Sequence, residues 1–193
     1  MAETTGTKSA AETIAGVAEL SDEALAMLQA DLDPRSFVER MTAGKLYRDA
    51  VQFLAHALPK REAVWWAWVA ARRASGANPP AKIAAALAAV ENWISQPSDE
   101  NRRAARAAGE KAEFRTPAGC VGLAVFLSGG SLAAPGAPEV PPGEYLSAKM
   151  VAGAVVVSAL ATEPEKGPEK FQSFISQGLE VARRNKLWEP KQG

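Results

Sequence analysis

Residues Lys60–Ser75 read KREAVWWAWVAARRAS and bring Trp65, Trp66 and Trp68 into one alanine-rich segment. Every residue between positions 63 and 71 is apolar. Successive residues of a helix are about 100° apart, so these side chains surround the helix, and a helix that is apolar on all sides is buried on all sides. We therefore expect a central core helix, with Trp65 in the middle of its tryptophan face and alanines on the opposite face.

Similar alanine-rich segments lie on both sides of this helix, with apolar residues at helical spacing and prolines at or just before the start of each pattern. Proline suits the first turn of a helix because its missing N–H is not needed there. Residues that commonly cap helix N-termini stand beside these starts: Ser21, Asp33, Asn78, Ser98 and Thr116. The predicted helices span 22–30, 34–58 with a bend near Ala43 and Gly44, 60–75, 80–95, 99–113, 117–128, 144–161 and 168–185.

Strand-like alternation is nearly absent, so the predicted fold is all-α, either a compact bundle or stacked helical hairpins of six to eight helices. Residues 1–20 lack firm periodicity and are expected to be a flexible N-terminal segment, residues 21–186 a single helical domain, and residues 187–193 a C-terminal tail. Within the domain, residues 129–143 (GGSLAAPGAPEVPPG) hold eight glycines and prolines and predict a loop. The part after this loop, with about 40 residues, is at the lower edge of the size needed for independent folding, so its two helices are expected to pack on those before the loop.

Composition excludes several classes of function. The 193 residues carry no net formal charge, which argues against a general nucleic-acid binder. One cysteine and one histidine exclude an internal disulfide and any metal site built from several thiolates or imidazoles, and no cofactor is expected. No signal peptide and no apolar run of about 20 residues is recognisable, so we expect a cytoplasmic protein without membrane insertion.

The tryptophan-rich helix also carries the candidate ligand-binding residues. Glu62, Trp65, Trp68 and Arg72 share one side of it by helical spacing. They could form a pocket with aromatic walls, an arginine for an anion and a carboxylate for a cation. The alternative, which the spacing favours, is an arginine stacked on an indole together with an ion pair at the edge of the core.

No other side chains form a recognisable catalytic set. His56 lies on a polar helix face without a nearby nucleophile and is expected to be solvated or at a helix end. Cys120 opens an apolar helix and is expected to be a small buried residue. The helix predicted over 99–113 has only alanines as its apolar face and is expected to be peripheral. Acidic residues at ion-pair spacing favour a solvated face over a phosphate site for its three arginines, Arg102, Arg103 and Arg106.

Residues 49–73 (DAVQFLAHALPKREAVWWAWVAARR) resemble the core signature of an uncharacterised bacterial family of small all-helical proteins. In that family a helix ending His-x-Leu-Pro is followed by Arg-Glu-Ala-Val-Trp-Trp. The resemblance implies no catalytic residues. It implies an association with type VI secretion components, and hence an adaptor or accessory role.

Three functions therefore stay open. The leading hypothesis is a non-enzymatic helical adaptor or accessory protein whose partner is another protein. The second is a small-molecule or peptide binder that uses the candidate pocket around Glu62, Trp65, Trp68 and Arg72. An enzyme of unrecognised type is the least favoured. The identity of the partner and the oligomeric state do not follow from the sequence.

Overall fold

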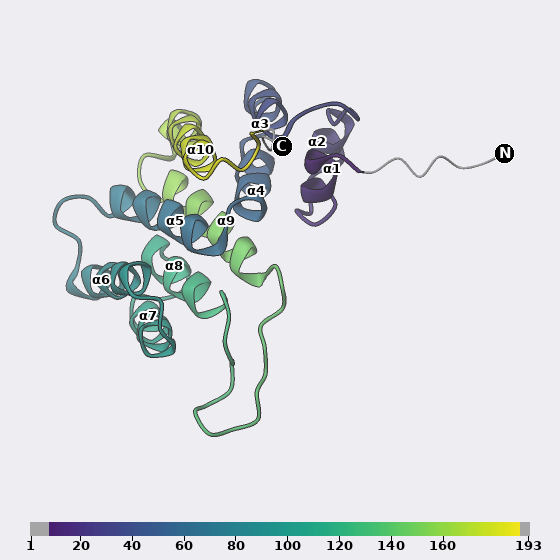
Figure 1. Cartoon of the computed structure of the whole chain (residues 1–193). Helices are drawn as coiled ribbons and strands as arrows, with labels where there is room; N and C mark the ends of the chain where they lie inside the picture. The colour runs from purple at the N-terminus through teal and green to yellow at the C-terminus, as the bar shows by residue number, and fades with distance from the viewer. Residues whose placement is uncertain (1–7, 190–193) are drawn as a thin grey trace.

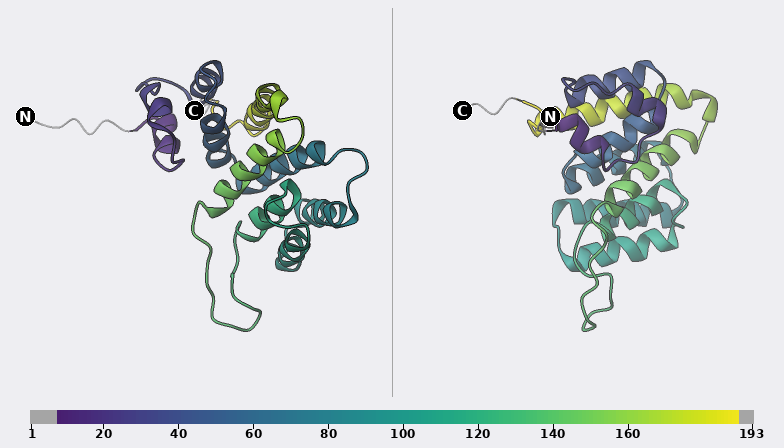
Figure 2. Two further views of the ribbon diagram at one scale, coloured as in Figure 1. Left: turned by 180° about the vertical axis from the view of Figure 1, so that it is seen from behind. Right: turned by 90° about the vertical axis from the view of Figure 1, so that its right-hand side faces the viewer.

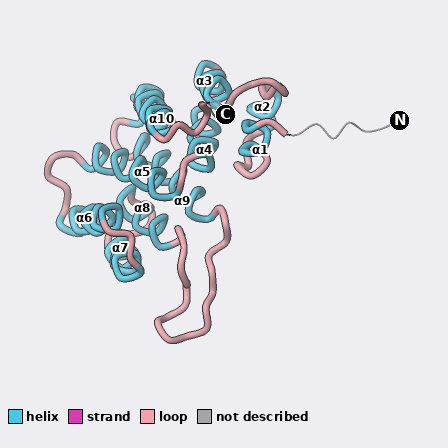
Figure 3. Tube along the Cα trace, in the orientation of Figure 1, coloured by secondary structure: helices cyan, strands magenta, loops and turns pink. Residues whose placement is uncertain are grey.

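The computed structural model describes residues 8–189. Within this range the chain forms ten α-helices, one short 3₁₀ helix and no strand (Figures 1 and 3). The predicted all-α fold is confirmed, with more helices than the six to eight expected. The elements are α1 (Ala10–Ala15), α2 (Asp22–Ala26), α3 (Pro34–Ala43), α4 (Tyr47–Ala57), α5 (Lys60–Ser75), α6 (Ala81–Ser95), α7 (Asp99–Lys111), α8 (Pro117–Phe126), α9 (Leu146–Leu160), η1 (Pro164–Lys166) and α10 (Gly167–Arg184).

One extra helix arises because the bend expected near Gly44 is a complete break. Lys45 adopts a left-handed conformation with φ 63°. The N–H of Leu46 donates to Met41 O at 2.9 Å, and that of Lys45 donates to Thr42 O at 3.1 Å. This pair of bonds is a Schellman motif, which satisfies the last carbonyls of α3 and reverses the chain before α4 begins.

Another helix lies in the segment that was expected to be flexible. Ser9 and Glu12 form a reciprocal capping box, in which Ser9 N–H donates to Glu12 Oε2 at 2.7 Å and Glu12 N–H donates to Ser9 Oγ at 3.2 Å. Ala11 and Ala15 of α1 are buried against the neighbouring helices. The expectation that residues 1–20 lack regular structure is therefore wrong for α1, while residues 1–7 lie outside the described part.

The predicted start signals are largely confirmed. Asp33 Oδ1 accepts from the N–H groups of Arg35 and Ser36, and the hydroxyl oxygens of three further predicted caps accept in the same way: Ser21, Ser98 and Thr116. Asn78 is the exception, because α6 begins after Pro80 without a side-chain cap. Proline and polar caps together therefore set most helix starts in this chain.

The helices form two groups with α5 and α9 between them (Figures 1 and 2). Helices α3, α4 and α10, with α1 and α2 beside α4, form one group, and α6, α7 and α8 form the other. Helix α9 packs on α4, α5 and α8, which all precede the loop, and α10 packs on α4 and α5. The helices after the loop therefore join the core of those before it, as expected.

The tryptophan face of α5 is centred on Trp66 rather than Trp65. Trp66 has no solvent exposure, and its Nε1–H donates to Phe174 O of α10 at 2.8 Å. Trp65 is only partly buried. The expectation for Trp65 is wrong because helical spacing defines faces without saying which neighbour covers each one, and here α10 covers Trp66. The opposite, alanine-lined face is buried as expected.

Helix α7 lies at the edge of the molecule, but its contact with α8 is unusually close (Figure 1). Gly109 of α7 faces Gly119 and Gly122 of α8. A Cβ placed on Gly122 would lie only 2.6 Å from Ala105 O and 3.1 Å from Gly109 Cα. The predicted peripheral position is therefore accompanied by backbone-to-backbone packing, which only glycine allows.

No single helix in residues 8–189 has both the length and the apolar character to cross a membrane. The segments Leu146–Leu160 and Pro164–Arg184 meet that test only as a pair, with a 118° bend between them.

Candidate functional site

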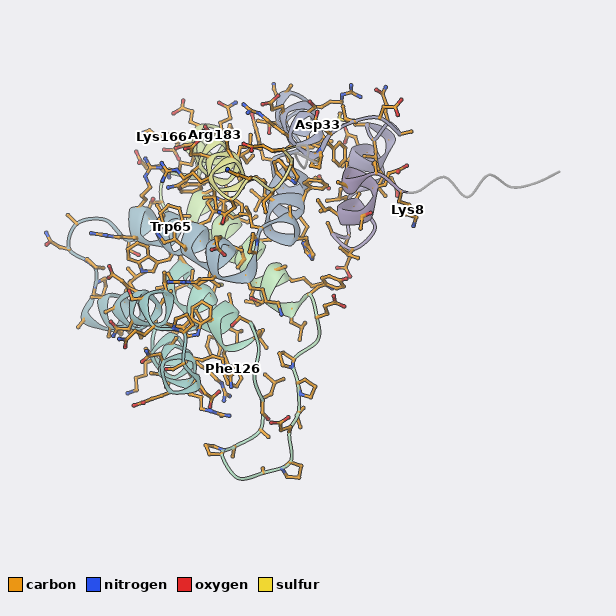
Figure 4. All side chains as sticks on the ribbon, in the orientation of Figure 1. Lys8, Asp33, Trp65, Phe126, Lys166 and Arg183 are labelled. Carbon is orange, nitrogen blue, oxygen red and sulfur yellow. The ribbon has the colours of Figure 1, made fainter. Side chains whose placement is uncertain are left out.

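A groove lies beside the partly buried Trp65 of α5, whose position Figure 4 marks. Its volume is about 260 Å³, and most of its lining is apolar. Arg61, Glu62 and Trp65 come from one face of α5, because residues three and four apart lie side by side on a helix. The ends of α6 and α10 supply the other walls: Ile94, Val181, Arg184 and Asn185.

The four predicted ligand-binding residues divide between two places. Glu62 and Trp65 line the groove, whereas Trp68 is buried toward α6, with its Nε1–H donating to Leu87 O at 2.9 Å. The Arg72 guanidinium lies 5.3 Å from the centre of the Trp68 ring. Trp68 and Arg72 therefore have the stacked arrangement considered as the alternative, and the groove is left with an indole and a carboxylate.

The two arginines of the groove are held by other groups. Arg61 Nε donates to Ile94 O at 2.8 Å, at the C-terminal end of α6. Arg184 Nε lies 2.9 Å from Glu180 Oε1, and hydrogen bonds from Arg183 and Arg184 lower the pKa of Glu180 to about 2. The groove thus offers an apolar floor with fixed charges around it, which suits an apolar side chain or a small ligand with a cationic group.

The predicted solvated face of α7 is wrong for Arg102. Its side chain is almost completely buried, with 4% of the residue exposed. Its Nη1 donates to Phe126 O at 2.6 Å, and its Nη2 donates to Ser131 O at 2.9 Å. Asp99 Oδ1 accepts from Nε at 3.0 Å, and the guanidinium stacks 4.7 Å from the centre of the Phe126 ring. Arg102 therefore joins α7, the end of α8 and the start of the following loop.

The other two arginines of α7 lie nearer the surface. Arg103 is partly buried, donates from Nη2 to the same Ser131 carbonyl at 3.2 Å, and pairs with Asp99. Arg106 is exposed, with its guanidinium 4.6 Å from the centre of the Phe126 ring. Phe126, at the end of α8 (Figure 4), therefore contacts the guanidinium groups of both Arg102 and Arg106 at the base of the loop.

The loop that starts there runs to the beginning of α9 and projects from the helical body (Figure 2). Leu132 N–H donates to Val140 O at 2.8 Å, so the two limbs of the loop are joined near its base. Ser131 Oγ accepts from the N–H groups of Ala133, at 3.1 Å, and of Val140, at 3.0 Å. Beyond these bonds, residues 134–141 are exposed. The predicted loop is therefore present, with a tied base and an exposed tip.

His56 is less solvated than expected. Its Nδ1 lies 2.8 Å from Gln52 O, so this nitrogen carries the proton and Nε2 is left as an acceptor. Nε2 is buried and has no hydrogen-bond partner among residues 8–189. The ring lies 5.8 Å from that of Tyr145, and burial lowers the pKa of His56 below its usual value. His56 is therefore a neutral packing residue at the junction of α4 and the start of α9.

Cys120 is buried as expected. Its Sγ–H donates to Phe114 O at 2.8 Å, and burial raises the pKa of the thiol. No group of three or more histidine, cysteine, aspartate or glutamate side chains in the described range is arranged to hold a metal ion.

A further cavity was not anticipated from the sequence. It lies between α3 and α10 and has a volume of about 500 Å³. Its charged groups pair with one another, Arg35 with Glu39 at 2.9 Å and Arg183 with Glu180 at 2.7 Å. These pairs are surface-exposed and lie on the helices that form the walls.

The described residues form an all-α protein with two surface features, a groove beside Trp65 and an anchored loop at residues 129–143. Residues 37–182 match a family of unknown function, DUF6931, and the chain belongs to this family. The match includes α4 and α5, where the resemblance to an uncharacterised family was found. No curated protein and no solved structure matches the chain.

Proposed function

We propose that this protein is a non-enzymatic helical adaptor that binds another protein, in the cytoplasm, through the loop at residues 129–143. The observation that carries this proposal is the tied base and exposed tip of that loop. A buried arginine is costly to hold, because its charge must be fully hydrogen-bonded. The N–H groups of Arg102 donate mainly to the carbonyls and the carboxylate at the base of the loop. These hydrogen bonds hold the loop in a defined place on the scaffold.

The partner proposed is a component of a bacterial type VI secretion system. The support is the resemblance of residues 49–73 to a family with that association. Those residues form most of α4 and α5, which lie largely in the core. The resemblance therefore concerns a shared scaffold, and the binding surface has to be sought elsewhere on the molecule, which again favours the loop.

Affinity purification from the native host tests this function. The tagged chain is compared with a variant whose residues 133–139 are replaced by a Gly-Ser segment of equal length, and with Asn78→Ser as a control in a different exposed loop. We expect the wild-type chain and the control to enrich the same partner, and the loop variant to lose it. Identical enrichment by all three would contradict the loop as the binding surface. Enrichment of nothing by the wild-type chain would contradict the adaptor function itself.

The second candidate function is binding of a peptide or small molecule in the Trp65 groove. The observation in its favour is a partly exposed indole on an apolar floor beside Glu62, since buried or half-buried aromatics with a few polar groups are typical of ligand sites. Ligand-observed NMR with a fragment library tests it. Fragments that bind the wild-type chain and not Ile94→Arg would support it, with Asn78→Ser as the matched control. Binding that survives in Ile94→Arg would exclude the groove.

A further inference from the structure

We infer that residues 138–142 are a preformed polyproline II ligand for a groove on the partner protein that is lined by aromatic side chains and carries a cation at its rim. This inference rests on the proposed adaptor function and adds the chemistry by which the partner recognises the loop. It is carried by four properties of this segment, whose sequence is PEVPP.

The first property is the restricted backbone. Pro138, Pro141 and Pro142 have φ fixed near −65° by their rings. Ala137, Val140 and Pro141 each precede a proline, which disfavours the helical region and shifts them toward extended or polyproline II conformations. Among the residues from 137 to 142, Glu139 alone escapes both restrictions. The described chain has no helix here, in agreement with these preferences.

The second property is the spacing of the prolines. Pro135, Pro138 and Pro141 are three residues apart, and a polyproline II helix has three residues per turn, so such residues share one edge. Gly136 interrupts the edge after Pro135, because it has φ 84° and lies in a turn closed by Ala137 N–H donating to Ala134 O. The usable edge therefore consists of Pro138 and Pro141, the spacing that aromatic grooves recognise in other polyproline ligands.

The third property is the lack of backbone donors. The three prolines of the segment have no N–H, and the N–H of Val140 already donates to Ser131 Oγ. The carbonyl of Val140 accepts from Leu132. A partner strand would find few free groups with which to form a ladder. Recognition must therefore use side chains, which favours a groove over strand addition.

The fourth property is exposed apolar surface. Four large apolar side chains are exposed in residues 8–189, and three of them, Val140, Tyr145 and Leu146, lie between position 140 and the first residue of α9. Exposed apolar side chains that gather in one segment, instead of being scattered singly, indicate an interaction site. Val140 directly precedes the edge proline Pro141, so its exposed side chain adjoins the edge that the partner covers.

The negative charge of this segment indicates that the partner's groove carries a cation. Glu139 is the only charged residue in 129–143, and it lies between the two edge prolines. A lysine or arginine at the rim of the partner's groove would pair with it and select the register and direction of the segment.

The tied base of the loop reduces the entropy that binding must overcome. The bonds of Ser131 with Val140 and with Arg102 restrict the limb before any partner arrives. A ligand that is already close to its bound conformation binds more tightly for the same contacts. Loosening the base through Ser131→Ala should therefore weaken binding without removing any side chain that touches the partner.

Site-specific photo-crosslinking in the native host tests this inference on the full chain. The photo-reactive amino acid p-benzoylphenylalanine is placed at Val140, and in a second strain at Ala107, an exposed position on α7. The protein captured through position 140 is purified, and its affinity is measured by calorimetry against the wild-type chain, the Pro138→Ala/Pro141→Ala double variant and Pro142→Ala. Circular dichroism confirms that each variant keeps its fold, which exposed loop residues should not disturb.

We expect capture at position 140, and about tenfold weaker binding by the double variant, as is typical when anchoring contacts are removed. Pro142→Ala, which lies off the edge, should bind with at most a small loss, and alanine substitution of aromatic residues in the captured peptide of the partner should reproduce the loss. Capture at Ala107 and not at Val140 would overturn the loop as the binding segment while the adaptor function stands. Equal affinities of the double variant and wild type would overturn the polyproline mode. Capture at neither position would overturn both.

Discussion

The two helix groups on either side of α5 and α9 are held together by opposite means. Where α4 and α5 meet α10, the space is filled by large side chains such as Leu54 and Trp66, which both lie against Gly178. Where α7 meets α8, the backbones approach so closely at Gly109, Gly119 and Gly122 that side chains are excluded.

This difference determines which kind of substitution destabilises each helix group. Large side chains that fill a gap leave a cavity when they are shortened, because the surrounding structure relaxes only partly. Backbones in direct contact have no room for added atoms, and enlargement forces the helices apart. The first half should therefore suffer from truncation and the second from enlargement, and the following substitutions test this contrast in order of expected effect.

Trp66→Ala should have the largest effect. It removes the most voluminous fully buried side chain and leaves Phe174 O without its donor. We expect the free energy of unfolding to fall by about 3–5 kcal/mol, the usual range for buried tryptophan truncation. Urea denaturation monitored by circular dichroism measures it. A loss below about 1 kcal/mol, the scale of typical surface effects, would contradict the filled core described for this half.

Gly122→Ala tests the other half, because it enlarges a side chain instead of shortening one. The new methyl group would lie 2.6 Å from Ala105 O, on backbone that cannot rotate away. We expect a loss of about 1–3 kcal/mol by overpacking. Gly153→Ala on α9 is the matched control, because no atom lies within 4 Å of its Cβ position, and it should stabilise the helix by about 0.5–1 kcal/mol. Stabilisation by both substitutions would show that the two helices are not in close contact.

Trp65→Ala should cost less than the neighbouring Trp66→Ala, although the sequence alone favoured Trp65 as the centre. Trp65 is partly exposed at the groove, so truncation removes less buried surface and opens the groove to water instead of leaving a sealed cavity. We expect about 1 kcal/mol, from the area that is buried. Equal losses for the two variants in the same denaturation experiment would place both indoles in the core.

The pH dependence of stability tests whether His56 is buried where α4 meets the start of α9. Burial lowers its pKa in the folded state, so between that value and about 6.5 the unfolded chain binds more protons than the folded chain. Stability contributed by neutral His56 is therefore complete above about pH 6.5 and decreases as the pH falls below it. Denaturation at pH 7.5 and pH 5.5, above the range where the carboxylates titrate, should show a smaller decrease for His56→Gln than for the wild-type chain. An identical decrease would mean that His56 is solvated.

Much of the fold could be predicted because it depends on local chemistry. Proline, Ser, Thr and Asp define the helix starts, and apolar spacing defines the faces. The capping box of Ser9 and Glu12 is also a local signal, but it lies in a polar segment without the apolar spacing that predicts a helix. Lys45 was not readable, because a lysine in the left-handed conformation has no local signal and is held there by the contacts of α3 with α4.

The candidate sites could be predicted only in part, because they depend on what packs across a helix. Helical spacing predicted that Glu62 and Trp65 lie together. It could not show that α6 covers Trp68, or that Arg72 stacks on Trp68 and so lies outside the groove. Arg102 looked like a solvated residue because its ion-pair partner Asp99 is local, whereas the carbonyls that bury it come from Phe126 and Ser131, which follow one helix later. Long-range partners of this kind leave no pattern in the sequence.

The position of α9 between the two helix groups has a consequence for synthesis on the ribosome. Its contacts are with α4, α5 and α8, which are all translated earlier, and with α10, which is translated later. A nascent chain that has released α1 to α8 therefore presents their apolar faces without the helix that covers them. Exposed surface of this kind favours aggregation and attracts chaperones. The core can close only once the loop, α9 and α10 have left the ribosome, so the helices translated first depend on those that follow the loop.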